Sequence, residues 1–432
     1  MIRRRPVREE TTLTKHRRSF WMGVGSGVLA SLMAALAAFG VWGLRRGAQH
    51  SQTGNAAVMA NLSSIEQVIR ERFLFDIDDE KLESGLYHGL LTGLDDPYSV
   101  YYDKEEYAQL SEDTSGRYCG IGVMVSQNAK TLQSTVIKVF EGSPGQEAGM
   151  QVGDILYQVD GTDVSAMDLD LIVSQHIKGE ENTQVQVTVL RGTQQVELTL
   201  TRRQIEAPTV EYTLLEDKTG YLVISQFDSV TGDQFKAAME DLQAQGMQRL
   251  VLDLRSNPGG TLDSAVEIAA YLLPEDQLDG LIVSTRDKQG KGERYFCRDG
   301  QIQYENDNPK VTDKTYPKPD GHQVDLPMAV LVNENSASAS ELLTGCLKDY
   351  HWATIVGTTT FGKGIVQEII PFNDGTAIKL TTKRYYTPGG TCVHGQGITP
   401  DVEIELPQEL KQKSSLSFQE DVQLQKAIEV LK

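Results

Sequence analysis

The sequence is poor in the residues from which metal centres and histidine-based active sites are built. It holds seven histidines and four cysteines in 432 residues. No HExxH segment, CxxC pair or GxSxG elbow occurs, which argues against a zinc protease, a zinc ribbon, a thioredoxin-type site and an α/β-hydrolase. We therefore expect no metal ion or organic cofactor. The four cysteines lie far apart, and we expect them to be free, with Cys346 buried as a small apolar residue.

Positive charge is scarce after the N-terminus. The chain carries 41 Lys and Arg against 60 Asp and Glu, which gives a formal net charge of −19. Residues 1–46 hold nine basic and two acidic side chains, so the remainder alone has a charge of −26. This balance argues against nucleic acid as a partner, because phosphate binding needs a basic face. The basic start indicates a membrane or targeting segment.

A run without charge follows the basic start. Residues 20–44 are 25 uncharged, mostly apolar residues, and roughly 20 such residues cross a bilayer as a helix. Because most of the flanking basic residues precede the run, the positive-inside rule places the N-terminus in the cytoplasm and the remainder outside. The sequence predicts a single-pass signal anchor in the cell membrane. A cleaved signal peptide is the alternative, although its apolar region is usually only about 7–15 residues long.

The hydrophobic pattern changes three times along the remaining chain. Apolar residues at helical spacing mark 56–93, short strands with glycine turns follow, and strands then alternate with helices from Thr209 onward. The sequence thus predicts a multidomain α/β (α+β) protein in which a small β-domain precedes a layered α/β core. The expected parts are a basic tail (1–19), the anchor (20–44), a linker with helices (45–115), the β-domain (116–203), the core (204–406) and a helical tail (407–432).

Ser338 is the first candidate for chemistry. A buried strand at 327–333 leads through a polar turn into a helix that begins near Ala339. At a helix N-terminus, free backbone N–H groups and the helix dipole favour a developing negative charge. The ordinary alternative is that a serine of this turn only caps the helix, with Glu341 completing a capping box.

Lys363 is the second candidate. It stands between Gly362 and Gly364, and a strand is expected after it, which would put Gln367 on the same face. The G-x4-G-K pattern imitates a phosphate loop, but Gly364 replaces the Ser or Thr that would bind magnesium, so we reject a nucleotide site. A lysine recessed among apolar neighbours can lose its proton and act as a base. The alternative is a solvated surface lysine.

The turn Asn-Pro-Gly-Gly at 257–260 is the third candidate, because glycines at a strand-to-helix corner let backbone N–H groups approach a ligand and form an oxyanion hole. An ordinary turn is the alternative. No Ser-His-Asp signature is evident, so a serine nucleophile in this chain would need another base, such as lysine.

Seven segments, in order and across about residues 60–405, resemble the carboxyl-terminal processing proteases, also called tail-specific proteases, which use a Ser-Lys dyad. The segments are LDDPYSVYY, YCGIGVMV, SPGQEAGMQVGDILYQVDG, LVLDLRSNPGGTLDSAVEIAAYLLP, LVNENSASASELLTGCLKDY, GTTTFGKGIVQ and TTKRYYTPGGTCVHGQGITPDVEI. The resemblance implies that Ser338 is the nucleophile, that Lys363 is the base and that Gln367 orients the lysine. It also implies Gly259 and the N–H of Ala339 as oxyanion donors.

Residues 116–203 resemble a PDZ domain, which binds a peptide's C-terminus as an added strand. The resemblance implies a carboxylate-binding loop at YCGIGV; its candidate peptide-binding residues are Tyr118, Gly120, Ile121, Gly122 and Val123. The alternative is a β-domain that only spaces the protease from the membrane.

Together these features predict a membrane-anchored, extracytoplasmic serine endopeptidase that captures exposed apolar C-terminal tails of proteins and cleaves through an acyl-enzyme. Two alternatives remain open: an inactive PDZ adaptor, and a Ser-His-Asp protease with a PDZ domain. The helices at 56–93 and 419–431 could pair subunits as a homodimer.

Overall fold

The computed structural model describes residues 55–432 except 275, 318–323, 411–412 and 414–415. The predicted anchor at 20–44 lies outside these residues. Within the described part, no helix combines the length and the apolar character needed to cross a membrane. The chain divides into two compact units, one up to Gly85 and one from Leu86 to the C-terminus.

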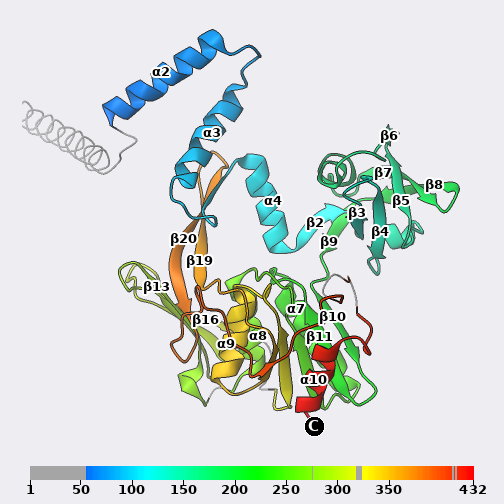
Figure 1. The fold of residues 1–432 in the computed structure, drawn as a ribbon, viewed down its shortest axis with the longest axis vertical. Helices are drawn as coiled ribbons and strands as arrows, with labels where there is room; N and C mark the ends of the chain where they lie inside the picture. The colour runs from blue at the N-terminus through cyan, green and yellow to red at the C-terminus, as the bar shows by residue number, and fades with distance from the viewer. Residues whose placement is uncertain (1–54, 275, 318–323, 411–412, 414–415) are drawn as a thin grey trace, which may run out of the picture. The chain divides into compact units, whose positions relative to one another are not determined.

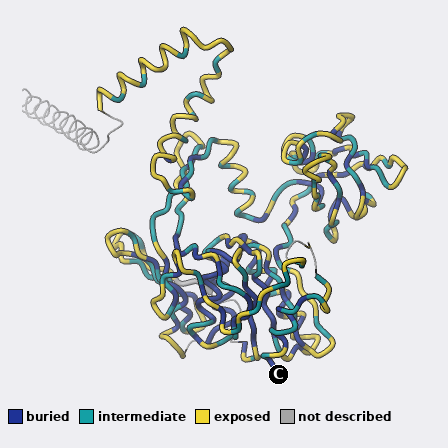
Figure 2. Tube along the Cα trace, in the orientation of Figure 1, coloured by how far each residue is buried: buried dark blue, intermediate teal, exposed yellow. Residues whose placement is uncertain are grey.

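The first unit contains the helix α2 (Ala56–Arg72) and the start of α3 (Asp79–Thr92). Asn55 caps α2 with its side chain, which accepts a hydrogen bond from the N–H of Ala57 at 3.0 Å. Figure 2 shows that α2 is almost entirely exposed, and none of its residues is buried. The two helices predicted between residues 56 and 93 are therefore present, and α2 packs against no core within its own unit.

The second unit begins within α3, and a connection then leads from the antiparallel sheet of the core to the small β-domain. Strand β1 (Val100–Tyr102) is followed by α4 (Lys104–Ser115). A reciprocal capping box of Asp103 and Glu106 marks the start of this helix. Gly116, with φ of +67°, ends the helix. A side chain at Gly116 would lie 2.7 Å from Val230 and 2.9 Å from Asp228, so glycine is required on both grounds.

The small β-domain is a six-stranded sheet in the order β3-β4-β5-β7-β8, with β6 beside β5 and β2 pairing separately with β9. Every second residue of β7 is buried (Val185, Val187 and Val189), as expected for a strand with one face in the core. Its strands are β2 (Arg117–Gly120), β3 (Val123–Gln127), β4 (Ser134–Val139), β5 (Ile155–Val159), β6 (Thr162–Asp163), β7 (Gln184–Arg191), β8 (Gln194–Thr201) and β9 (Arg203–Glu206). Its helical segments are α5 (Pro144–Glu147), α6 (Leu169–Leu171) and the π-helical turn η1 (Ile172–Ile177).

The core contains two sheets, of which the first is mainly parallel (Figure 1). Its order is β10-β11-β12-β17-β18-β21, and only the β10–β11 pair is antiparallel. The strands are β10 (Val210–Leu214), β11 (Thr219–Ile224), β12 (Arg249–Asp253), β17 (Met328–Val332), β18 (Thr354–Gly357) and β21 (Val402–Glu403). The helices around it are α7 (Thr231–Ala244), α8 (Leu262–Leu272), α9 (Ala339–Asp349) and α10 (Val422–Val430).

Both faces of this parallel sheet are covered. Leu250, Leu252 and Val330 pack in one hydrophobic cluster with α7, α8 and α9. The alternate residues Val251 and Ala329 pack in a second cluster with α10. The predicted layered α/β core and the predicted C-terminal helix are both present. The near-continuous apolar strands follow from burial on two faces.

The second sheet is antiparallel and extends from the layered core. Its order is β1-β20-β13-β14-β15-β16, and β19 also pairs with β20. The strands not yet defined are β13 (Leu281–Asp287), β14 (Glu293–Arg298), β15 (Gln301–Asn306), β16 (Lys314–Pro317), β19 (Ile365–Pro371) and β20 (Ala377–Tyr386), and the short 3-10 turn η2 is Leu278–Gly280. The motif LDDPYSVYY enters this sheet through β1, which pairs with β20. This pairing brings residues near 98 beside residues near 363 and 379.

Candidate active site

Ser338 lies where β17 has ended and α9 begins, and its backbone is in an unusual conformation. Its φ of 55° and ψ of −113° are rarely adopted by residues other than glycine, and such strain is concentrated at functional sites. The hydroxyls of the neighbouring Ser336 and Ser340 are buried and donate to the carbonyls of Leu254 (2.7 Å) and Asn257 (3.0 Å). Ser338 instead lines a pocket.

A single buried carboxylate joins the loop of Ser338 to the loop of Lys363. Glu341 Oε2 accepts the backbone N–H of Ser338 at 2.9 Å and that of Lys363 at 2.8 Å. Glu341 Oε1 accepts the N–H of Gly362 at 2.7 Å and the hydroxyl of Thr360 at 2.6 Å. These four donors satisfy a carboxylate that is fully buried, which would otherwise be costly. Glu341 thus does more than the predicted capping box requires, because it also holds the lysine's backbone.

The Asn-Pro-Gly-Gly turn lies directly against Ser338. A side chain on Gly259 (φ +99°) would come within 2.7 Å of the Ser338 Cβ, so only glycine fits there. The N–H of Gly259 already donates to Asn257 Oδ1 at 2.8 Å. Among the described residues, the N–H groups of Gly260 and Ala339 donate to no protein atom, and both residues line the pocket with Ser338. Gly260, which the sequence did not single out, therefore has a freer donor than Gly259.

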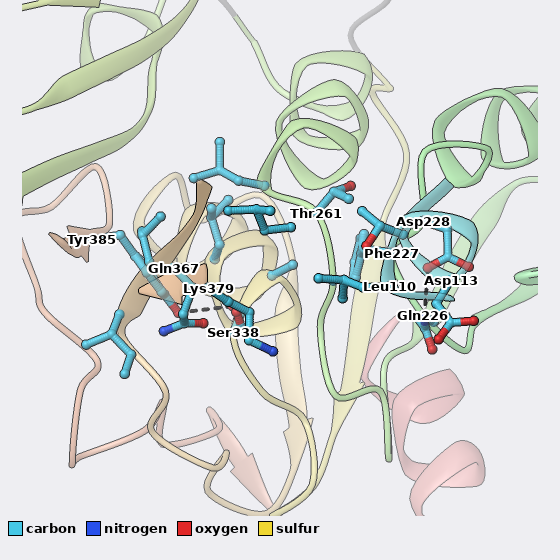
Figure 3. A pocket seen from close by; sticks show the side chains of 18 residues that line it. Leu110, Asp113, Gln226, Phe227, Asp228, Thr261, Ser338, Gln367, Lys379 and Tyr385 are labelled. Carbon is cyan, nitrogen blue, oxygen red and sulfur yellow. Dashed lines mark hydrogen bonds between the residues drawn. The ribbon is translucent and has the colours of Figure 1, made fainter. Parts of the chain in front are cut away.

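The pocket around Ser338 has a volume of about 430 Å³ (Figure 3). Phe227, Leu262 and Leu342 are among its apolar lining residues. Gln367 and Lys379 lie beside Ser338 in Figure 3. The buried hydroxyl of Tyr385 donates to the carbonyl oxygen of Ser338 at 3.0 Å, which fixes the strained residue from the strand side.

Lys363 is near this site, but its amine is not among the groups that line the pocket. Its Nζ lies 4.5 Å from the centre of the Tyr98 ring, a cation–π distance. The pKa of Lys363 is lowered from its ordinary value, first by burial and then by the charge of Lys379, while Asp96 and Glu341 act in the opposite direction. The sequence showed no carboxylate close to Lys363; the fold brings in these two from residues far away in the chain.

The strand period expected to put Lys363 and Gln367 on one face does not apply, because Lys363 precedes the strand. Strand β19 begins only at Ile365, and its register with β20 shifts between Val366 and Gln367. The extra residue of this bulge is Thr382 on β20, because Val366 pairs with Lys383 and Gln367 pairs with Thr381, so the alternation along β19 itself continues. Gln367 lines the pocket, where its amide nitrogen donates to Thr381 Oγ1 at 3.3 Å, and no hydrogen bond joins its side chain to the Lys363 amine.

Lys379 is a pocket residue that sequence reasoning missed. It is on β20, lines the same pocket as Ser338, and has its Nζ 5.3 Å from the centre of the Tyr102 ring. Nothing in the segment AIKLTTKR distinguishes it from other strand lysines, because its position depends on the pairing of β20 with β1 and β19.

The predicted peptide-binding loop connects β2 to β3. Tyr118 and Gly120 belong to β2, Ile121 and Gly122 form the corner, and Val123 starts β3. The carbonyl of Ile121 accepts the N–H of Gly145 in α5 at 2.8 Å, and that of Gly122 accepts the N–H of Phe140 after β4 at 3.0 Å. The N–H groups of these two residues donate to no atom of the described chain.

Burial and close packing fix this loop. Burial raises the pKa of Tyr118 to about 12. A side chain on Gly122 (φ +69°) would lie 2.4 Å from Ser143.

All four cysteines are free, as expected, and Cys346 is buried. The described residues contain no group of three or more His, Cys, Asp or Glu side chains arranged for a metal ion.

Sequence comparison places these parts in a known class. Residues 218–404 match the model of peptidase family S41, residues 135–191 match a PDZ domain, and residues 40–106 match the activating protease CtpB N-terminal domain. The fold and the site therefore define a PDZ-containing protease core.

The chain belongs to peptidase family S41, as its relatives also indicate. It is 36% identical to a probable CtpA-like serine protease of Staphylococcus epidermidis over 362 residues, which cover 83% of this chain and 68% of the relative. A protein of the same description from Staphylococcus aureus is 35% identical over 356 residues, 82% of this chain and 66% of the relative. The chain thus spans about two thirds of the length of these curated relatives.

Among solved structures, a photosystem II D1 C-terminal processing protease is 29% identical. The match covers 81% of this chain and 88% of that one, with a TM-score of 0.43.

Proposed function

We propose that this protein is a serine endopeptidase that processes protein chains from their C-terminal side through a Ser-Lys dyad. The observation that carries the proposal is Ser338, strained at the start of α9, in a pocket with two unoccupied N–H donors. In the proposed reaction, the Ser338 hydroxyl gives its proton to the base and attacks the peptide carbonyl. The C–N bond then breaks, the amine leaves with that proton, and water hydrolyses the acyl-enzyme that remains.

Lys363 is the proposed general base. Burial favours its neutral form, which a base at neutral pH requires. Its backbone shares the Glu341 carboxylate with that of Ser338, so the two loops are neighbours, and its four-carbon stem is flexible. The step therefore needs the amine to leave Tyr98 and turn toward the serine. Gln367 is the proposed partner that receives it there, since its side chain already lines the pocket.

The tetrahedral oxyanion is proposed to bind the N–H groups of Ala339 and Gly260. Both are free of other partners among the described residues, and Ala339 is at the positive end of the α9 dipole. Gly259 is the less suitable donor while its N–H is bound to Asn257, but it remains essential because any side chain there would collide with Ser338.

The test is to replace the dyad residues one at a time in the full chain and measure cleavage of a protein with an apolar C-terminal tail. Ser338→Ala and Lys363→Ala should each reduce kcat by at least about 10³-fold. Lys363→Arg should be equally inactive, because guanidinium does not release its proton in a protein. An active arginine variant would mean that Lys363 acts only as a positive charge.

The same assay separates the alternatives. Wild-type protein that binds tails without cleaving them would indicate the inactive adaptor. A Ser-His-Asp protease requires one essential histidine, whereas the dyad mechanism expects activity to survive replacement of His322, His351 and His394 in turn.

The PDZ domain is proposed to capture an exposed, apolar C-terminal tail. The two free N–H groups of Ile121 and Gly122 support this role, since backbone donors of such a loop can bind a terminal carboxylate. Amidation of a substrate's C-terminus should therefore raise KM about tenfold or more, with little change in kcat, since a charge-assisted hydrogen-bond pair is worth about 1.5–3 kcal/mol. Equal processing of free and amidated tails would leave the domain as a spacer.

A further inference from the structure

A basic groove crosses the antiparallel sheet beside the catalytic pocket. Its volume is about 560 Å³, and it lies where β13 pairs with β20. Arg286, Arg384 and Tyr386 line it from the two strands. Arg286 and Arg384 are exposed. Thr285 and Tyr385, which stand next to them along the two strands, are buried. The two arginines therefore project from the solvent face of the sheet.

The register of the two strands sets the arginines directly opposite each other. Arg286 is the cross-strand partner of Arg384, and Ser284 is the partner of Tyr386. Directly opposite residues have Cβ atoms about 4.5–5.5 Å apart, and like charges in such a pair are destabilising. An unrelieved pair of this kind indicates a site that an anion completes.

No carboxylate of the described chain neutralises this pair. The Arg286 guanidinium lies over the Tyr386 ring at 4.4 Å, which leaves its N–H edges available. Neither arginine forms an ion pair with a described residue, and Lys288, also exposed, lines the same groove. By contrast, Lys383 is neutralised by Glu293 and Glu368, each at 2.6 Å.

The two acidic residues of the groove already have donors of their own. Asp287 accepts the N–H groups of Gln289 and Lys291 within its hairpin turn, at 2.8 and 2.9 Å. Asp96 accepts the N–H of Tyr98 and the hydroxyl of Ser99, at 3.2 and 2.6 Å. Four basic side chains line the groove (Arg286, Lys288, Lys383 and Arg384) against these two acidic ones, so the lining has a formal charge of +2 on a chain whose formal charge is −19.

The groove also holds a donor without a partner and adjoins the catalytic pocket. The hydroxyl of Thr382 is buried and has no hydrogen-bond partner among the described residues. Ile365 lines both the groove and the pocket of Ser338. The groove and the catalytic pocket therefore share one wall residue, which puts the groove near a substrate chain that extends by about 3.3 Å per residue.

We propose that this groove binds an acidic segment of the substrate chain, through bidentate contacts of Arg286 and Arg384 with Asp or Glu carboxylates close to the cleaved bond. The inference rests on the proposed protease function and extends it to substrate specificity. It makes the enzyme prefer chains that carry a short acidic stretch beside the cleavage site, in addition to an apolar tail.

The first test measures binding with the inactive Ser338→Ala protein, so that no cleavage intervenes. Two fluorescent peptides share one apolar C-terminal tail and differ only in an internal Asp-Glu-Asp or Asn-Gln-Asn stretch. At low salt, we expect the acidic peptide to bind at least tenfold more tightly. Adding Arg286→Gln and Arg384→Gln should remove that difference, and so should high salt. The control pair Lys310→Gln and Lys432→Gln removes two exposed positive charges elsewhere and should preserve it.

The second test uses active enzyme and separates KM from kcat. The double arginine variant should raise KM for the acidic peptide about tenfold and leave kcat unchanged, and the amide peptide should show neither change. Amidating the C-terminus of both peptides should not remove the preference, because the groove reads side-chain carboxylates. A preference that disappears on amidation would assign the effect to the tail and overturn the inference.

Failure of this inference differs from failure of the proposed function. If wild-type enzyme cleaves both peptides equally and the arginine variants change nothing, the groove has no role in specificity while the protease assignment stands. If the Ser338→Ala protein still cleaves, the proposed dyad is wrong. The binding measurement of the first test still shows whether the groove recognises acidic peptides. A third outcome is that the wild type, but not the double variant, binds phosphatidylglycerol vesicles while its affinity for the two peptides is equal. This outcome would assign the groove to a membrane surface and overturn the inference.

Discussion

At the scale of single residues, the position of the Lys363 amine is the decisive feature. Tyr98 stabilises the charged form of this amine through its ring, and Asp96 does so through its charge, while burial and Lys379 favour the neutral form. The lysine is thus balanced between a charged resting state beside Tyr98 and the neutral state that the proposed reaction needs.

Replacing Tyr98 with Leu should shift that balance. Loss of a cation–π contact worth about 0.5–1 kcal/mol lowers the lysine pKa by roughly 0.4–0.7 units. Because the base must be neutral, activity rises with pH through this pKa, and the acidic limb of kcat/KM should move to lower pH by that amount. Tyr98→Phe keeps the ring and should leave the limb in place. Lys379→Gln should move the acidic limb to higher pH, because the charge of Lys379 lowers the pKa of Lys363. If the limb of the Tyr98→Leu variant moves to higher pH instead, this assignment of Tyr98 is refuted.

At the scale of elements, two carboxylates connect the catalytic loops to helices. Glu341 of α9 holds the loops of Ser338 and Lys363 together. Asp421, at the N-terminus of α10, accepts two hydrogen bonds from the Arg255 guanidinium, at 2.8 and 3.0 Å. Arg255 lies between the end of β12 and the Asn-Pro-Gly-Gly turn. Arg255 also binds Asp253 at 2.6 Å, and both acidic partners are buried. The C-terminal helix is therefore tied to the strand end that positions the proposed oxyanion donors.

Asp421→Ala should destabilise the core by about 3 kcal/mol, since removing one partner of a buried ion pair typically costs about 3–5 kcal/mol and Arg255 retains Asp253. The variant also loses the cap that Asp421 gives to the N–H of Leu424 at 2.9 Å. Urea unfolding measures the effect. Glu429→Ala breaks the more exposed pair with Lys426 on the same helix and should cost less than about 0.5 kcal/mol. Similar midpoints for the two variants would show that the Arg255 cluster contributes nothing to stability.

At the scale of the whole molecule, the chain is proposed to be held at the cell membrane by residues 20–44 with its protease core outside the cytoplasm. The support is the sequence itself: 25 residues without charge, preceded by seven basic residues and followed closely by two. The exposed helix α2, which has no buried residue, is the proposed site of subunit pairing. Both proposals concern parts of the chain outside the α/β core.

A reporter fused after Lys432 tests the topology. An enzyme that is active only outside the cytoplasm, such as alkaline phosphatase, should be active in the fusion, and one that is active only inside should not. Replacing the seven basic residues before Phe20 with neutral ones should reduce the outside activity, because the orienting charge is lost. Cytoplasmic activity of the intact fusion would overturn the localisation.

The sequence by itself determined the order of the parts and the identity of the reactive segments. The spacing of apolar residues marked the helices, the small β-domain and the layered core. Burial of one or two faces of an element sets this spacing, which can be read within a single segment of sequence. The turn before α9 and the Asn-Pro-Gly-Gly corner were recognisable for the same reason: a helix start and a glycine turn each have a local signature.

Only the tertiary structure decided what surrounds the reactive groups. The pairing of β19 with β20 set Gln367 opposite Thr381, the pairing of β1 with β20 brought Tyr98 and Asp96 to the lysine, and the register of β13 with β20 set Arg286 against Arg384. Each depends on strand pairing between different segments, from Val366 with Lys383, 17 residues apart, to Val100 with Lys379, 279 residues apart. Such pairing, and the charges it brings together, leaves no periodic signal in any one of the segments involved.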